Sequence, residues 1–160
     1  EETDPEFLHY AASALPEVER DGVRLRVIAG RAFGVESPVR VYAPTLYVDV
    51  EFEGAGSFIV PCEHEERALY VIAGDVRVDR VPAPAQHLMV LPASGDVEVT
   101  ATTSARVLLC GGAVLDGERF LWWNFVSSSR QRIEQAKADW LARRFGAVPG
   151  ESEFIPLPER

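Results

Sequence analysis

The stretch "TLYVDVEFE", residues 45–53, decides the fold class of this chain. Its apolar residues recur at every second position: Leu46, Val48, Val50 and Phe52. The residues between them are one tyrosine and three carboxylates: Tyr47, Asp49, Glu51 and Glu53. Because successive side chains of a β-strand point to opposite faces, this alternation predicts a strand with one buried face and one solvent-facing face.

Further short apolar runs follow, each bounded by Gly, Pro, Asp or Ser, which are the residues that turns require. These runs are "SFIVP", "RALYVIA", "DVRV", "HLMVLP", "DVEVTA" and "ARVLLC". Many short strands at this spacing, with no helical pattern between them, predict an all-β antiparallel barrel or sandwich over residues 22–125.

A second stretch, "FLWWNFVSSSRQRIEQAKADW" at residues 120–140, predicts a change from strand to helix. The run "WWNF" is expected to form a strand of the barrel. Ser128 and Gln131 have the spacing of a capping box, so the helix is expected over residues 126–146. Gly146 is expected to end it.

Both ends of the chain carry large apolar side chains that the chain alone can hardly cover. Residues 1–21 are expected to form an N-terminal strap or linker, and the Pro-rich residues 147–160 an extended tail. A tryptophan hides about 150–250 Å² on burial, so the strand–helix corner needs a neighbouring layer, domain or subunit. The side chains expected to pack there are Trp122, Trp123, Phe125, Trp140, Phe154 and Ile155.

The composition excludes several classes of partner. The chain has 160 residues and a formal net charge of -9, so a nucleic-acid backbone would be repelled by scattered basic residues of this kind. No run approaches the roughly 20 apolar residues of a membrane span. We therefore expect a cytoplasmic protein that binds neither nucleic acid nor membranes.

Cys62 and Cys110 are expected to be buried small hydrophobes, with Cys110 facing the core.

Four segments carry a family resemblance: "PTLY" (44–47), "HEERALYVIAGDV" (64–76), the stretch 120–140, and "VPGESEFIPLP" (148–158). Together they resemble the C-terminal half of the pirin family, which are two-domain proteins of the cupin superfamily. The resemblance implies a cupin-type double-stranded β-helix (jelly-roll) barrel with one C-terminal helix and a tail. It also implies that iron or another divalent transition metal is held by an N-terminal barrel that precedes this chain.

A metal-binding cupin needs two histidines two residues apart on one strand, a glutamate a few residues on, and a third histidine from a later strand. At the positions of the histidine pair this chain has Val60 and Cys62, and at that of the glutamate it has Arg67. Val97 and Glu98 stand near the place of the third histidine. No catalytic, cofactor or metal ligand is therefore expected in this barrel, and the charge of Arg67 opposes a cation.

A weaker alternative is an improvised metal site. It would combine Cys62 and His64, which would share a strand face, with His87 and either Glu63 or Glu66.

Three functions follow as hypotheses. In the first, the chain is a metal-free cupin domain that packs against and shields the metal site of an N-terminal barrel, in a protein similar to metal-dependent quercetin 2,3-dioxygenases. In the second, it is a regulatory protein-interaction module. In the third, it is a free-standing homodimeric cupin with a pocket for a small apolar ligand.

Overall fold

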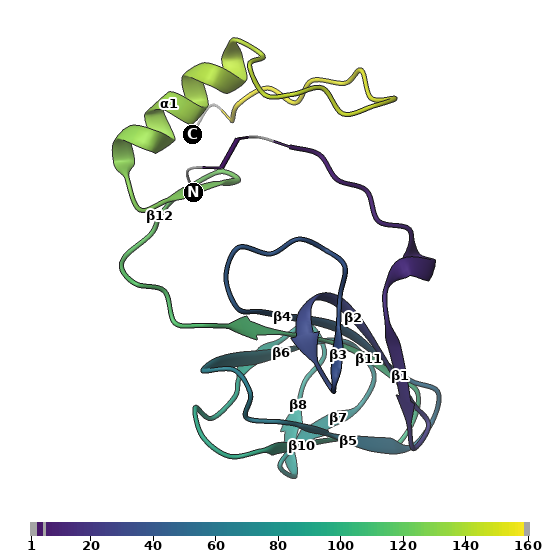
Figure 1. The fold of residues 1–160 in the computed structure, drawn as a ribbon. Helices are drawn as coiled ribbons and strands as arrows, with labels where there is room; N and C mark the ends of the chain where they lie inside the picture. Colours follow the sequence, from purple (N-terminus) through teal and green to yellow (C-terminus); the bar gives the residue numbers. More distant parts are fainter. Residues whose placement is uncertain (1–2, 5, 159–160) are drawn as a thin grey trace. The chain divides into compact units, whose positions relative to one another are not determined.

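The computed structural model describes residues 3–4 and 6–158. The chain divides into two compact units. Tyr10–Val114 form the first, which we call the barrel unit; the residues up to His9 and from Leu115 onward form the second, which we call the helical unit (Figure 1).

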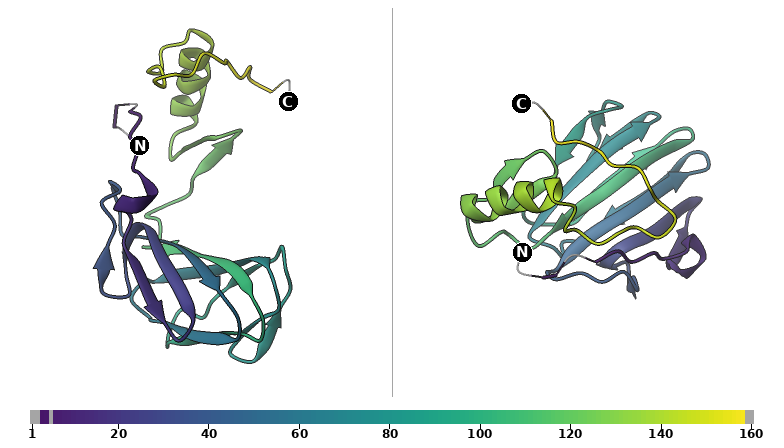
Figure 2. Two further views of the ribbon diagram at one scale, coloured as in Figure 1. Left: turned by 90° about the vertical axis from the view of Figure 1, so that its right-hand side faces the viewer. Right: turned by 90° about the horizontal axis from the view of Figure 1, so that it is seen from above.

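The barrel unit consists of two antiparallel sheets, which confirms the all-β prediction. The larger sheet has the order β1 (Glu17–Arg20), β2 (Val23–Ala32), β4 (Thr45–Phe52), β11 (Ala105–Gly112), β6 (Glu66–Ala73) and β9 (Leu88–Val90), with β3 (Val35–Glu36) paired to β2. The smaller sheet has the order β5 (Gly56–Val60), β10 (Val97–Ala101), β7 (Val76–Val78) and β8 (Val81–Ala83). A 3-10 turn at Ala12–Ala14 precedes β1. Figure 2 shows the strands of the larger sheet running side by side as one layer.

The predicted alternation along β4 is confirmed, with one exception. Leu46, Val48, Val50 and Phe52 are at most 3% exposed and belong to the core between the sheets. The exception is Asp49, which is also buried although it lies on the opposite face of the strand.

Glycine is required where neighbouring strands approach closely. Gly74 ends β6 with a φ of +94° and forms the turn into β7, at the place where the "AGD" sequence indicates one. A Cβ atom at this position would lie 2.5 Å from the Ala105 side chain. Only glycine accommodates both the backbone angle and the contact.

The helical unit holds a two-stranded hairpin and one helix. β12 (Phe120–Trp122) pairs with β13 (Phe125–Ser127), and α1 runs from Arg130 to Leu141. The prediction that "WWNF" is a barrel strand is wrong: Trp122 pairs with Phe125 in this hairpin, Trp123 and Asn124 form its turn, and none of the four is part of either barrel sheet. Within the described residues, no helix is long and apolar enough to cross a membrane.

The helix is shorter than the expected range 126–146. Its N-cap is Ser129 instead of Ser128: the Ser129 hydroxyl accepts a hydrogen bond from the Arg132 backbone N–H at 3.4 Å. The start is later because β13 holds residues up to Ser127 in an extended conformation. The end comes before Gly146, because Arg143 adopts a left-handed conformation with φ 53°.

Candidate functional site

The proposed metal ligands of the barrel unit are not brought together. The Cys62 thiol lies 3.6 Å from the carbonyl oxygen of Ala93, and His64 Nε2 lies 3.0 Å from that of Arg31. The Nδ1 atom of His87 lies 2.9 Å from the carbonyl oxygen of its near neighbour, Ala85. In the described part of the chain, no three His, Cys, Asp or Glu side chains form a group that could hold a metal ion.

Arg67 takes the place that the cupin spacing gives to the glutamate ligand. It is only 2% exposed, and its guanidinium donates hydrogen bonds to backbone carbonyls of two loops. A permanent cation at this position repels a metal ion, so the residues present do not fit a metal site.

Both cysteines differ from expectation. Cys62 follows β5 and is exposed, so the prediction that it is buried is wrong. Cys110 is half-buried, but it faces away from the core because the preceding residue, Leu109, points into it. Partial burial raises the pKa of the Cys110 thiol. In the run "ARVLLC", Arg106 lies on the same face as Leu108 and Cys110, and this charge is the signal that could have indicated the outer face for Cys110.

Cys110 belongs to an apolar surface on the outer face of the larger sheet. The strand register places Cys110 beside Ala68 of β6 and Tyr47 of β4, and Ala68 beside Val90 of β9. A second row combines Leu88, Tyr70 and Leu108. We call this surface the outer patch: Tyr47, Ala68, Tyr70, Leu88, Val90, Leu108 and Cys110.

The outer patch is uncharged and hollowed. Leu88 is 57% exposed and Val90 81% exposed. Ala68, Val90 and Cys110 line one part of a groove of about 420 Å³, whose lining also includes the charged residues Glu65, Glu66 and Arg67. Large exposed apolar side chains that are contiguous on one face mark an interaction site.

Elsewhere on the outer face, charged side chains pair across the strands. Arg24 bonds to Glu51 at 2.7 Å, and Arg106 holds both carboxylate oxygens of Asp49 at 2.9 Å. The hydrogen bond and charge of Asp49 raise the pKa of Arg106. These pairs satisfy the charged side chains within the sheet, whereas Leu88 and Val90 of the outer patch remain exposed among the described residues.

The two edges of the larger sheet also differ. The edge strand β1 carries Glu17, Glu19 and Arg20, whereas the opposite edge strand β9 has the uncharged sequence "LMV". Natural proteins protect exposed strand edges with charges, prolines or covering segments. The edge strand β9 therefore lies unprotected by charge or proline beside the outer patch.

A second apolar surface lies in the helical unit, where six aromatic rings contact one another: Trp122, Trp123, Phe125, Trp140, Phe145 and Phe154. We call this the aromatic cluster. Its centre is Trp140, whose ring centroid lies 5.2 Å from that of Trp123 and 5.8 Å from that of Phe154. The indole N–H of Trp140 donates to the carbonyl oxygen of Ile155 at 2.8 Å, which fixes the tail on the helix.

The aromatic cluster is incompletely covered. Among the described residues of the helical unit, the only buried apolar side chain is Ile133, at 5% exposure. Trp123 and Phe154 remain 36% exposed each. Cations cover some ring faces: Lys137 lies 4.5 Å from the Trp122 ring centre, and Arg143 lies 4.6 Å from that of Phe154.

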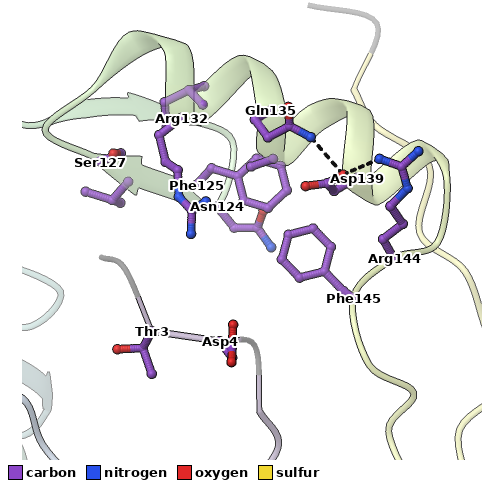
Figure 3. A pocket seen from close by; sticks show the side chains of 13 residues that line it. Thr3, Asp4, Asn124, Phe125, Ser127, Arg132, Gln135, Asp139, Arg144 and Phe145 are labelled. Carbon is purple, nitrogen blue, oxygen red and sulfur yellow. Dashed lines mark hydrogen bonds and ion pairs between the residues drawn. The ribbon is translucent and has the colours of Figure 1, made fainter.

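A groove of about 460 Å³ lies beside the cluster (Figure 3). Phe125 and Phe145, whose rings stack at 5.8 Å, form part of its apolar lining. At its rim, Asp139 accepts hydrogen bonds from Gln135 and Arg144 at 2.9 Å each, and these interactions lower the pKa of Asp139. The groove therefore combines an apolar floor with a fixed polar rim.

A family described as the pirin C-terminal cupin domain matches residues 47–146. The chain belongs to the pirin family. A pirin-like protein of Caulobacter vibrioides is 46% identical over 162 residues, which cover 99% of this pirin chain and 56% of the relative. Human pirin is 28% identical, with 86% of this chain and 50% of the human protein covered.

A crystal structure described as quercetin 2,3-dioxygenase from Acinetobacter baumannii matches this pirin domain with a TM-score of 0.75 and 28% identity. The match covers 91% of this chain and 52% of the other. The pirin domain thus spans about half the length of the relatives it matches.

Five of the six residues expected to pack at the strand–helix corner lie in the aromatic cluster of this pirin domain; the sixth, Ile155, is 61% exposed and contacts Trp140 through its backbone carbonyl, and the outer patch was not expected. Trp122, Trp123, Phe125 and Trp140 contact one another as a group, and the tail joins them through Phe154. The ring of Phe145 was not among the expected packing residues. Its position shortly after the helix is the feature that could have revealed it.

Proposed function

We propose that this pirin domain is a docking and shielding domain, which packs against a second barrel of a longer protein and has no reaction centre of its own. The observation that carries the proposal is the aromatic cluster, whose rings contact one another but stay partly exposed. The partner is the part of the full-length protein that this chain does not include. Its existence is supported by relatives about twice as long as the chain.

The free energy available from docking is substantial. Covering the exposed 36% of Trp123 would remove about 90 Å² from water and contribute about 2 kcal/mol. Phe154 is exposed to the same fraction. The outer patch adds Val90 and Leu88, which are still more exposed. Each surface by itself offers exposed apolar area that a neighbouring domain can cover.

For the longer protein we propose a metal-dependent activity of the quercetin 2,3-dioxygenase type. The support is the structural match at 28% identity to a protein so described. Iron or another divalent transition metal would be held by the second barrel, because the residues of this one do not fit an ion. The role of this domain would be to exclude water from that metal and to complete the wall of its pocket.

The first test is a chimaera in which this chain replaces the matching part of the Caulobacter pirin-like protein. In a Cys62→Ser background, Cys110 is the remaining thiol of this chain and lies on the outer patch, and mass spectrometry of its own peptide follows its modification separately from any thiol of the relative. We expect a thiol reagent to modify Cys110 at least tenfold more slowly in the chimaera than in the isolated chain. Equal rates would contradict docking through the outer patch.

The second test compares two lysine substitutions in the chimaera. Val90→Lys places a charge in the outer patch and should restore fast modification of Cys110. The matched control is Val81→Lys, because Val81 is 56% exposed on β8 of the other sheet.

Quercetin oxidation by the isolated chain with added Fe, Cu or Ni would refute the assignment of the reaction centre to the second barrel. A stable homodimer of the isolated chain through the outer patch would favour the homodimeric cupin instead.

A further inference from the structure

A buried arginine closes one end of the barrel. Nη1 of Arg67 donates to the carbonyl oxygens of Val60 at 3.3 Å and Pro61 at 3.0 Å. Nη2 donates to the carbonyl oxygens of Pro92 at 2.6 Å and Gly95 at 2.9 Å. Four backbone carbonyls from two separate segments thus converge on one guanidinium.

The two segments belong to different sheets. One is the end of β5 in the smaller sheet, Val60, with Pro61 after it, and the other is the loop that joins β9 of the larger sheet to β10 of the smaller one. Arg67 itself lies on β6, and its backbone carbonyl accepts from the Leu91 N–H at 2.9 Å. A side-chain carboxylate of Asp96 adds a further link between the loops by accepting from the Cys62 N–H at 2.9 Å.

The guanidinium has no counter-ion within the described part of the chain. Among the described residues, its hydrogen bonds all go to neutral carbonyls, and its Nε atom is buried without a partner. Removing a charge from water is costly unless hydrogen bonds replace the lost hydration. Here four charge-assisted bonds replace it, so the loops and the cation stabilise each other.

We propose that Arg67 is a built-in cation, which occupies the end of the barrel where a metal-binding cupin holds its ion and clamps the loops that surround it. A metal ion draws ligands from several strands together, and a planar guanidinium with five donors can do the same for carbonyl oxygens. The barrel therefore has a rigid, closed end without an exchangeable ion. This inference does not depend on the proposed docking function.

Cys62 provides a natural reporter of the clamp. It is exposed on the first loop, and its thiol contacts the Ala93 carbonyl of the second at 3.6 Å. When the loops separate, this contact is lost and the thiol becomes more accessible. A Cys110→Ser background leaves Cys62 as the only thiol.

The test uses the full chain with Arg67 replaced. Arg67→Ala leaves the four carbonyls without a donor, and we expect modification of Cys62 and amide exchange at Leu91 to accelerate at least tenfold. Millimolar methylguanidinium should slow both rates again, because it fits the vacated space. Urea at the same concentration, which is planar but uncharged, should not.

The matched control is Arg106→Ala, since Arg106 also makes two side-chain hydrogen bonds but lies on the outer face with a half-exposed side chain. This variant should leave both loop rates unchanged and show no response to methylguanidinium. Unchanged rates in Arg67→Ala, or an equal response in both variants, would overturn the proposal.

Arg67→Lys keeps the test decisive if Arg67→Ala does not fold. The lysine ammonium retains the charge, but its single nitrogen cannot donate to all four carbonyls as the two terminal nitrogens of a guanidinium do. We therefore expect a three- to tenfold acceleration of Cys62 modification. A rate equal to that of the unsubstituted chain would show that the forked hydrogen bonds do not hold the loops.

Discussion

Replacing Trp140 by alanine should unfold the helical unit and leave the barrel unit intact. Trp140 contacts four other rings, those of Trp123, Phe125, Phe145 and Phe154. Its indole N–H also holds the tail through the hydrogen bond to Ile155.

The magnitude follows from these contacts. Each aromatic pair contributes about 0.5–1.5 kcal/mol. The rings are partly exposed, so we take the lower part of that range and expect about 2 kcal/mol for four pairs. The hydrogen bond adds about 1 kcal/mol. A loss of about 3 kcal/mol is large for a unit whose described residues include one buried apolar side chain.

Trypsin provides the assay, because Arg143 and Arg144 follow the helix directly and lie beside the cluster. In Trp140→Ala we expect cleavage there to be about 100-fold faster, since 1.4 kcal/mol corresponds to about tenfold. Trp140→Phe loses mainly the hydrogen bond and should be cleaved about fivefold faster. Leu141→Ala, at a neighbouring position that is 64% exposed, is the control and should change little.

Cleavage of Trp140→Ala at the rate of the unsubstituted chain would refute the assignment of Trp140 as the centre of the cluster. A matching drop in the thermal midpoint of the barrel would refute the independence of the two units.

Three further predictions concern stability. Because the pKa of Cys110 is raised, the folded chain retains a thiol proton that the unfolded chain loses at alkaline pH. The contribution of Cys110 to the free energy of unfolding should therefore be fully present below the ordinary cysteine pKa and decline as the pH rises above it. Urea titrations at pH 7 and 9.5 should show this loss, and Cys110→Ser should lack it. Asp49→Asn should cost about 1 kcal/mol in a urea titration, because the amide replaces the charged partner of Arg106. Ser129→Ala should cost the helix about 1 kcal/mol in far-UV circular dichroism melts, and a larger loss for Ser128→Ala would contradict the observed cap.

Sequence reasoning succeeded where the physical rule is local. The alternation in residues 45–53 identified a strand and its buried face, because side-chain direction depends only on the neighbouring residues. Ser129 shows the limit of such rules: three consecutive serines can all cap a helix, and the choice depends on where the preceding hairpin ends.

Reasoning failed where the partner is distant. Asp49 looked like a solvent-facing carboxylate, but it is buried by Arg106, which lies 57 residues away. The "WWNF" run is apolar enough for a barrel strand, but Trp123 and Asn124 form the turn of a hairpin in which Trp122 pairs with Phe125.

The order of the amino acids was therefore enough to establish an antiparallel β domain, a terminal helix, membership of the pirin family, and Arg67 at the place where a metal-binding barrel has a glutamate. Folding in three dimensions established what surrounds these residues: the outer patch depends on the register of four strands, and the Arg67 clamp on carbonyls up to 28 residues away. The reason is physical. Periodicity is a property of adjacent residues, whereas register and backbone hydrogen bonds form between segments whose separation along the chain leaves no local trace.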